Sequence, residues 1–397
     1  MPDRTRTPIS ARVLSAVAAA AALVVLGAAG QAEASTYTVS NANADGSGSL
    51  TNALNRADRD SRRDTVSFAP GLSGEVPVAP EQGVTYPVRI VGNGAVTLAG
   101  APGGSRLQLW TTRRARSRLQ NLTLARVAVV ANGGTRRSGG IQVIDASLDG
   151  QGRTPGNGIT AERAPLTVSG SRVSGYLGSG IYTVQSPTRI TTTTIDANSV
   201  HGAYSTLGTM VIQSSTVSSN FGWGVLSDYR GSVALTNVTV SGNGNPADVD
   251  SGGIGAFDGV IQADSSTIAA NHSPRAGGPG GAAGAAINGN AGGTITLANS
   301  VVAANDGANC ATGPRYVSAG GTVYDDPSRC GGISAGDQLA DPLLGPLADN
   351  GGPTRTHALG AGSPAIGGAT GTAPLLDQRG MTRDGAPDSG AYERTGP

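Results

Sequence analysis

Two aspartates and an arginine are spaced in a way that suits acid–base chemistry on a polymer. Asp149 and Asp196 occupy the same position in two repeats of the sequence, and Arg172 lies in the repeat between them. If neighbouring repeats stack as strands about 4.8 Å apart, the carboxylates lie about 9.6 Å apart. That is the edge of the range used by inverting glycosidases, which pair a general acid with a general base. We favour the simpler interpretation, a surface ion-pair cluster without catalysis.

A second group is aromatic, in a chain with only 4% aromatic residues. Counted from the nearest glycine, Tyr182 and Tyr204 occupy one repeat position, and His201 and Trp223 occupy another beside it. Exposed rings on a regular wall can stack on sugar rings, whereas buried rings would only fill a corner. The alternation of residues places the tyrosines outward, so we predict a ligand-binding site at these four residues.

The basic residues are all arginine, because the chain contains no lysine. This excludes a Walker-type phosphate loop and Schiff-base chemistry. The segment between Glu81 and Asp145 has no acidic residue, and it carries a cluster of four arginines suited to polyanions: Arg113, Arg114, Arg116 and Arg118. The alternative is a solvated face balanced by acids elsewhere. The formal net charge is +1, which argues against a dedicated nucleic-acid binder.

Common catalytic and metal-binding motifs are absent from the sequence. There is no Gly-x-Ser-x-Gly elbow and no His-Glu-x-x-His motif, and the three histidines are scattered. The segment from Gly252 to Asp258 approaches a calcium-binding nonapeptide, but its aspartate comes one place late and the motif stands alone. We therefore expect no cofactor and no metal.

A repeat positions all of these residues. Eight equivalent apolar anchors follow one another at spacings of 24, 25, 22, 22, 23, 28 and 34 residues: Leu124, Leu148, Val173, Ile195, Val217, Val240, Ile268 and Val302. Three residues before each anchor is a turn former, and three residues after it five consecutive copies carry asparagine: Asn198, Asn220, Asn243, Asn271 and Asn305. A period in the twenties, rich in Val, Ile, Thr and Ser, is typical of a β-solenoid.

One repeat has the length of three short strands and three corners. Anchors should point inward and meet the same anchor in the next coil, while Asn, Asp, Ser and Gly serve the corners. A helical repeat is the alternative, but β-branched residues dominate and no apolar period of 3.6 persists. The longer copies place their extra residues in polar or glycine-rich loops. The repeats therefore predict an all-β fold of stacked parallel strands.

The ends of the chain differ from the repeats. Residues 1–34 resemble a secretory signal peptide, with arginines, an apolar stretch and the sequence Ala32-Glu33-Ala34; an uncleaved anchor is the alternative. Residues 35–110 should form an N-terminal cap and the first coils, with a short amphipathic helix after Ser49. The repeats occupy residues 111–305. The two cysteines, Cys310 and Cys330, should form one disulfide in an exported chain.

Both ends of the exported part resemble a known family. The segments TYTVSNANADGSGSL, DTVSF and VRIVGNGAVTL are similar to the opening of bacterial extracellular right-handed parallel β-helix repeat proteins. The end of the chain, with DPLLGPLADNGGPTRTHALGAGSPAIG, DQRG and DSGAYE, resembles the choice-of-anchor Q domain. Gly367 departs from the acidic residue usual there. The resemblance implies a right-handed parallel β-helix whose residues 306–397 form an irregular, disulfide-tied cap. It implies no catalytic residue set.

We therefore expect an exported, monomeric protein at or outside the cell envelope. Its first-choice role is non-catalytic binding of a polysaccharide or another envelope polymer. A polysaccharide lyase or glycoside hydrolase is the alternative, and a structural surface spacer is the second alternative. No membrane span is expected after removal of the signal.

Overall fold

The eight anchors form one internal stack in the computed structural model of the chain. Each of them is 0% exposed, and each pairs in register with the anchor of the next coil, as Val173 does with Ile195 and Ile195 with Val217. The stack continues beyond the repeats, to Leu98 and Val76 at one end and to Tyr324 at the other. The parallel β-helix predicted from the repeats is confirmed.

The structure describes residues 34–111, 115–134, 138–245, 251–272, 285–290, 292–306, 308–311 and 314–395. These residues belong to one unit, and residues 1–33 lie outside the description. Nearly all of the predicted signal peptide therefore lies outside the described residues. Within the described ranges, no helix is long and apolar enough to cross a membrane.

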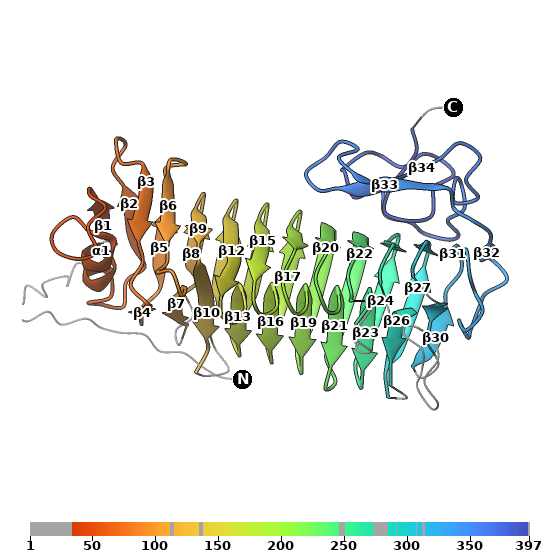
Figure 1. Cartoon of the computed structure of the whole chain (residues 1–397), viewed down its shortest axis with the longest axis horizontal. Helices are drawn as coiled ribbons and strands as arrows, with labels where there is room; N and C mark the ends of the chain where they lie inside the picture. The colour runs from red at the N-terminus through yellow and green to blue at the C-terminus, as the bar shows by residue number, and fades with distance from the viewer. Residues whose placement is uncertain are drawn as a thin grey trace, which may run out of the picture. The chain divides into compact units, whose positions relative to one another are not determined.

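Each coil contributes strands to three parallel columns (Figure 1). The first column is a sheet of ten described strands: β4 (Glu81–Val84), β7 (Ser105–Trp110), β10 (Val127–Asn132), β13 (Ile159–Glu162), β16 (Ile181–Val184), β19 (Ala203–Thr206), β21 (Val225–Asp228), β23 (Ile254–Phe257), β26 (Ala285–Gly289) and β29 (Ala308–Cys310). Inward and outward residues alternate along these strands, so every second side chain enters the core.

The other two columns belong to one larger sheet, because long strands run through the corner between them. The second column contains β1 (Thr36–Val39), β2 (Asp64–Phe68), β5 (Val88–Val91), β8 (Ser117–Gln120), β11 (Ile141–Ile144), β14 (Leu166–Ser169), β17 (Pro187–Thr191), β24 (Val260–Asp264), β27 (Thr294–Ala298) and β30 (Arg315–Ser318). The third contains β3 (Gly74–Pro77), β6 (Val96–Ala99), β9 (Thr123–Ala125), β12 (Ser147–Thr154), β15 (Arg172–Tyr176), β18 (Thr194–Asp196), β25 (Thr267–Ala269), β28 (Val301–Ala303), β31 (Val323–Tyr324) and β32 (Gln338–Leu339). Strands β20 (Thr209–Ser218) and β22 (Ser232–Ser241) span both columns.

The corner between the second and third columns is made by the turn formers that precede the anchors. All eight have a positive φ, between 47° and 59°: Asn121, Asp145, Gly170, Thr192, Ser214, Asn237, Ser265 and Asn299. One left-handed residue bends the chain from one column into the next within a single position. The repeat position predicted as a turn is confirmed.

The repeated asparagines form a continuous ladder after the third column, buried from Asn198 to Asn271 and half-buried at Asn305. Each Nδ2 donates to the Oδ1 of the asparagine in the next coil, at 2.8–3.1 Å. The ladder continues past the last predicted member, because Asn305 donates to Asn309 at 2.9 Å and Asn309 donates to Asp325 Oδ1 at 2.7 Å. All of the amides point in one direction, and the row ends on a carboxylate.

A short helix closes the N-terminal end of the coil. Helix α1 (Leu50–Ala57) begins after Ser49, whose hydroxyl accepts a hydrogen bond from the Asn52 amide at 3.1 Å. Its buried residues are Leu50, Ala53, Leu54 and Ala57, the apolar face expected from their spacing. The predicted helical cap is confirmed, and it covers the open apolar end of the first coil.

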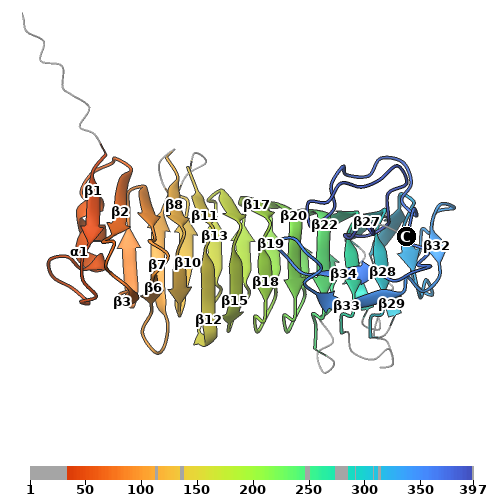
Figure 2. The same cartoon turned by 90° about the horizontal axis from the view of Figure 1, so that it is seen from above.

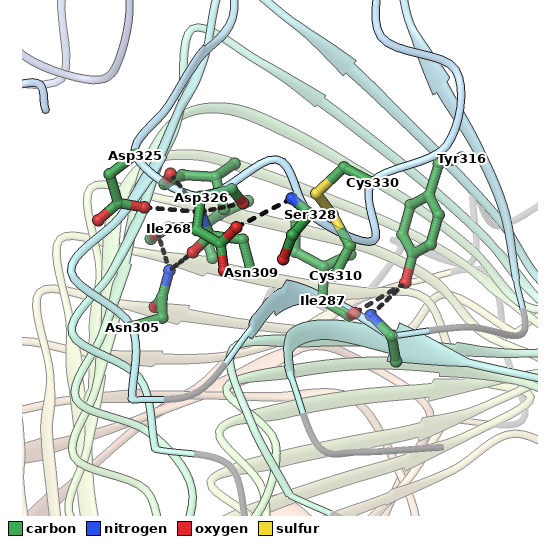
Figure 3. The surroundings of a disulfide bond; sticks show 12 residues. Ile268, Ile287, Asn305, Asn309, Cys310, Tyr316, Asp325, Asp326, Ser328 and Cys330 are labelled. Carbon is green, nitrogen blue, oxygen red and sulfur yellow. Dashed lines mark hydrogen bonds between the residues drawn. A yellow bond between two sulfur atoms is a disulfide. The ribbon is translucent and has the colours of Figure 1, made fainter. Parts of the chain in front are cut away.

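A disulfide lies within the last coils and joins the end of β29 to the segment after β31. Cys310 and Cys330 are bonded, with their Cα atoms 5.0 Å apart, as predicted. Figure 3 shows the bond beside the end of the asparagine ladder, where Asn309 reaches Asp325. Parallel pairing runs past residue 305, the predicted boundary, through β30, β31 and β32 to Leu339.

The remaining residues form a mostly irregular layer whose regular part is the antiparallel pair β33 (Leu344–Ala348) and β34 (Thr356–Leu359). Figures 1 and 2 show this layer, in dark blue, against the strands from β20 to β31. Gln378 anchors it by donating to Thr216 at 2.9 Å and accepting from Thr239 at 2.7 Å. Beneath the surface, Arg383 and Glu393 form an ion pair of 3.0 Å with both side chains 1% exposed.

Candidate functional site

Two tyrosines on adjacent coils form an outward-facing ring pair on the ten-stranded sheet. In β16, Ile181 and Thr183 are fully buried, so Tyr182 between them must point outward. Tyr182 pairs in register with Tyr204 of β19, and their ring centroids are 4.9 Å apart at 38°. Both side chains are half-buried. The predicted outward column of tyrosines is present.

A carboxylate and an imidazole hold Tyr204 in place. Its hydroxyl donates to Asp228 Oδ2 at 3.0 Å. Burial raises the pKa of Tyr204 to about 12, and the nearby Asp228 carboxylate adds to the effect. The ring of His201 meets Tyr204 edge-on, with centroids 5.4 Å apart. Since His201 Nδ1 accepts the Trp223 backbone N–H at 3.0 Å, that nitrogen carries no proton.

The prediction that Trp223 is an exposed stacking residue is wrong. Its side chain is only 2% exposed. A Cβ added to Gly255 would lie 3.0 Å from the indole, so Trp223 covers the bare backbone of that glycine in β23. Its ring also meets Phe257 edge-on at 5.9 Å. Trp223 therefore fills a hollow that glycine leaves in the outer surface.

Two acidic residues that were not predicted from the sequence lie beside the tyrosines. Glu162 of β13 is exposed, and Asp228 of β21 is half-buried. We call the outward surface made by Glu162, Tyr182, Tyr204, His201 and Asp228 the tyrosine face. These residues come from four successive coils, so the face is about 14 Å long. Strand register could have identified both acids, because they occupy one outward column two residues beyond the tyrosines.

A groove of about 270 Å³ lies at the edge of the same sheet. It is lined by Trp110, Asn132, Glu162 and Arg163 together with two glycines. Trp110 is 42% exposed and shares the outward column of Asn132 and Glu162. The groove therefore offers an aromatic side and hydrogen-bonding groups next to the tyrosine face.

Two members of the predicted acid–arginine cluster, Arg172 and Asp196, form an ion pair of 2.7 Å on the third column, away from the ten-stranded sheet that carries the tyrosine face. Arg172 Nε and Nη2 donate to the two oxygens of Asp196 at 3.0 and 2.7 Å. This hydrogen bonding raises the pKa of Arg172, against an opposing effect of burial, and the charges of Asp196 and Asp149 also raise it. Asp196 was expected to face solvent, yet it is only 6% exposed. Asp149 Oδ1 accepts the Gln151 amide at 2.8 Å.

Half of the predicted polyanion cluster can be placed. Arg113 and Arg114 lie outside the described residues, while Arg116 is exposed and Arg118 half-buried. Arg118 Nε and Nη2 both donate to Gln142 Oε1, at 3.1 and 3.0 Å. Arg118 also pairs in register with Arg89 of β5. In the described part of the chain, no group of three or more His, Cys, Asp or Glu is arranged to hold a metal ion.

No protein-family model and no curated protein sequence matches the chain. Among solved structures, pectate lyase Pel9A is similar over 91% of this chain and 96% of its own, with a TM-score of 0.46 and 16% identity. A tailspike protein, Dettilon gp208, covers 77% and 69%, with a TM-score of 0.42 and 11% identity. The periplasmic alginate epimerase AlgG covers 66% and 78%, with a TM-score of 0.39 and 9% identity. Likeness at this level does not transfer an activity.

Proposed function

We propose that this chain is an exported β-helix protein that binds polysaccharide on the tyrosine face without cleaving it. The ring pair of Tyr182 and Tyr204 is the observation that carries the proposal. Two rings on adjacent coils present a flat, partly apolar surface to solvent, which suits the C–H faces of sugar rings. Hydroxyl and carboxylate groups at the rim of the rings supply hydrogen bonds to sugar hydroxyls.

The rigidity of the site supports a binding role. Tyr204 is fixed by its hydrogen bond to Asp228, and its strand pairs on both sides with neighbouring coils. A ring held in the free protein loses little conformational freedom when a ligand arrives. Stacked coils also repeat at a spacing close to the length of a sugar unit, so successive side chains can follow successive sugars.

The acid–arginine cluster is poorly suited to glycoside hydrolysis. That reaction needs one carboxyl group that keeps its proton until it protonates the leaving oxygen. Arg172 instead donates to both oxygens of Asp196, at 3.0 and 2.7 Å, so neither oxygen is left to a leaving group alone. Asp149 is engaged by a backbone amide. We therefore assign Asp149, Arg172 and Asp196 to an ion-pair cluster on the coil surface.

An exported location agrees with the chemistry of the chain. The first 34 residues resemble a secretory signal, and the Cys310–Cys330 disulfide persists in an oxidising environment. The resemblance of the C-terminal residues to the choice-of-anchor Q domain supports a place at the cell surface. We propose the monomer as the binding unit, since the tyrosine face lies wholly within one chain.

Affinity electrophoresis through gels that contain soluble polysaccharides tests the proposal. Wild-type protein should be retarded by at least one polymer, and both Tyr182→Ala and Tyr204→Ala should restore mobility. Tyr204→Phe separates the contribution of ring stacking from that of the hydroxyl group, because it keeps the ring and removes the hydrogen bond to Asp228. Retardation that persists in both alanine variants would contradict the proposal.

Two controls and one enzymatic assay accompany that experiment. Tyr86→Ala removes another half-exposed tyrosine, beyond β4, and should leave retardation unchanged. Asp196→Asn should also leave it unchanged. The same polymers are assayed for new reducing or unsaturated ends. If wild type releases such ends and Asp149→Asn or Asp196→Asn abolishes the release, the protein is an enzyme and the binding proposal is wrong.

A further inference from the structure

The tyrosine face has an unusual charge distribution. Strands β10, β13, β16, β19, β21 and β23 carry only two charged residues, Glu162 and Asp228, and both are acidic. Arginines come close only at the corners that follow, where Arg163 comes directly after Glu162 and Arg230 two residues after Asp228. Both corner arginines have a positive φ and exposed side chains at the edge of the sheet. The middle of the face is therefore negative.

The second column has the opposite charge. Among β2, β5, β8, β11, β14 and β17 the outward residues include Arg89, Arg118 and Arg189, whereas the one acid, Asp64, is 1% exposed. Each of these arginines donates to a glutamine of the next coil: Gln120, Gln142 and Gln213. Glutamine is neutral, so the positive charges are oriented but not compensated by these contacts. The coil thus separates its charges between two faces.

We propose that the tyrosine face selects uncharged polysaccharides and discriminates against acidic ones, an inference that rests on the proposed function. A neutral sugar chain lying on Tyr182 and Tyr204 brings hydroxyl groups to Glu162 and Asp228. Carboxylates accept hydrogen bonds from such hydroxyls, and these charge-assisted bonds are stronger than neutral ones. Asp228 keeps acceptor capacity, because each of its oxygens has one described donor, from Tyr204 and from the Tyr229 amide.

A uronate polymer would meet a different environment. Its carboxylates, one on every sugar, would lie against Glu162 and Asp228 with no arginine on the same strands to pair with them. Like charges in contact oppose binding, and a partly buried site screens them less than open solvent does. The geometry that favours a neutral chain therefore penalises an acidic one.

Retardation is measured in gels that contain either neutral polymers (mixed-linkage β-glucan, xylan, glucomannan) or acidic ones (polygalacturonate, alginate), at low and high salt. Wild type should bind at least one neutral polymer with little salt dependence, and acidic polymers at least about tenfold more weakly. The double variant Glu162→Gln, Asp228→Asn should reduce the difference in affinity between neutral and acidic polymers. Arg118→Gln, on the second column, should leave the binding of neutral polymers unchanged.

The outcomes separate this inference from the function on which it rests. Tight binding of an acidic polymer that Tyr204→Ala abolishes would overturn the charge selection and keep the binding site. An acidic polymer could also bind in a salt-sensitive way that Arg118→Gln abolishes and Tyr204→Ala does not. That result would place the acidic polymer on the arginines of the second column, as the charge separation predicts. No retardation by any polymer would contradict the proposed function itself.

Discussion

Replacing Asn243 by alanine should destabilise the coil more than replacing an asparagine outside the ladder by alanine. Asn243 is fully buried in the middle of the asparagine ladder. Its Oδ1 accepts the backbone N–H and the side-chain Nδ2 of Asn220, at 3.1 and 2.8 Å. Its Nδ2 donates to Asn271 Oδ1 at 3.0 Å and to the Val217 carbonyl at 2.9 Å. One side chain therefore joins three coils.

The cost follows from which groups lose their partners. Alanine leaves the buried Asn220 N–H without its acceptor, and a buried unsatisfied donor costs about 1–3 kcal/mol. The side-chain Nδ2 of Asn220 still donates to the Ile195 carbonyl at 3.1 Å. Loss of its bond to the Asn243 side chain therefore costs only about 1 kcal/mol. The expected loss of unfolding free energy is therefore roughly 2–4 kcal/mol.

Urea unfolding followed by circular dichroism measures this loss, and hydrogen exchange locates it. The Asn243→Ala variant should unfold at a lower urea concentration, and the amide of Asn220 should exchange faster. Asn132→Ala is the control, because Asn132 is a half-buried asparagine on the outward side of β10, outside the ladder. Its effect should stay within about 0.5 kcal/mol. Equal midpoints for the two variants, or unchanged exchange at Asn220, would refute the role of the ladder.

Two further predictions concern the C-terminal part of the chain. His357 is buried between Ser241 Oγ and the Gly345 carbonyl, and burial lowers its pKa below the usual 6.5. The folded state therefore binds fewer protons than the unfolded state, and the stability of the fold falls as the pH drops below about 6.5. His357→Gln should flatten this pH dependence in thermal unfolding measured at several pH values, and an identical slope in the variant would contradict the prediction. The Cys310–Cys330 disulfide closes 20 residues, so the double serine variant should lose about 3 kcal/mol in urea unfolding, and an unchanged midpoint would show that the loop adds nothing.

Much of the fold could be predicted because the coil repeats its own contacts. Each anchor, such as Val217, meets the anchors of the coils on either side, so one spacing in the sequence determines many contacts. The left-handed corners between the second and third columns are equally regular, since a short polar residue or glycine precedes every anchor by three residues. Local chemistry and periodicity are both visible in a sequence, and here they agree with the structure.

The features that could not be predicted depend on contacts between distant segments or on a missing side chain. Gln378 meets Thr239 across 139 residues, and no repeat relates the two. Trp223 was placed on the exposed wall by its repeat position, but Gly255 in a later coil leaves the hollow that buries it. Asn309 extends the ladder although it comes only four residues after Asn305, outside the period of the repeat.

The most direct test of the account is the mobility of Tyr204→Ala and wild type in the same polysaccharide gels. Removing the ring takes away half of the pair with Tyr182, whose centroids are 4.9 Å apart. We expect wild type to be retarded and the variant to bind roughly tenfold more weakly, while both unfold at similar urea concentrations. Equal retardation of the two folded proteins would contradict it, because the polymer would then bind somewhere other than the tyrosine face.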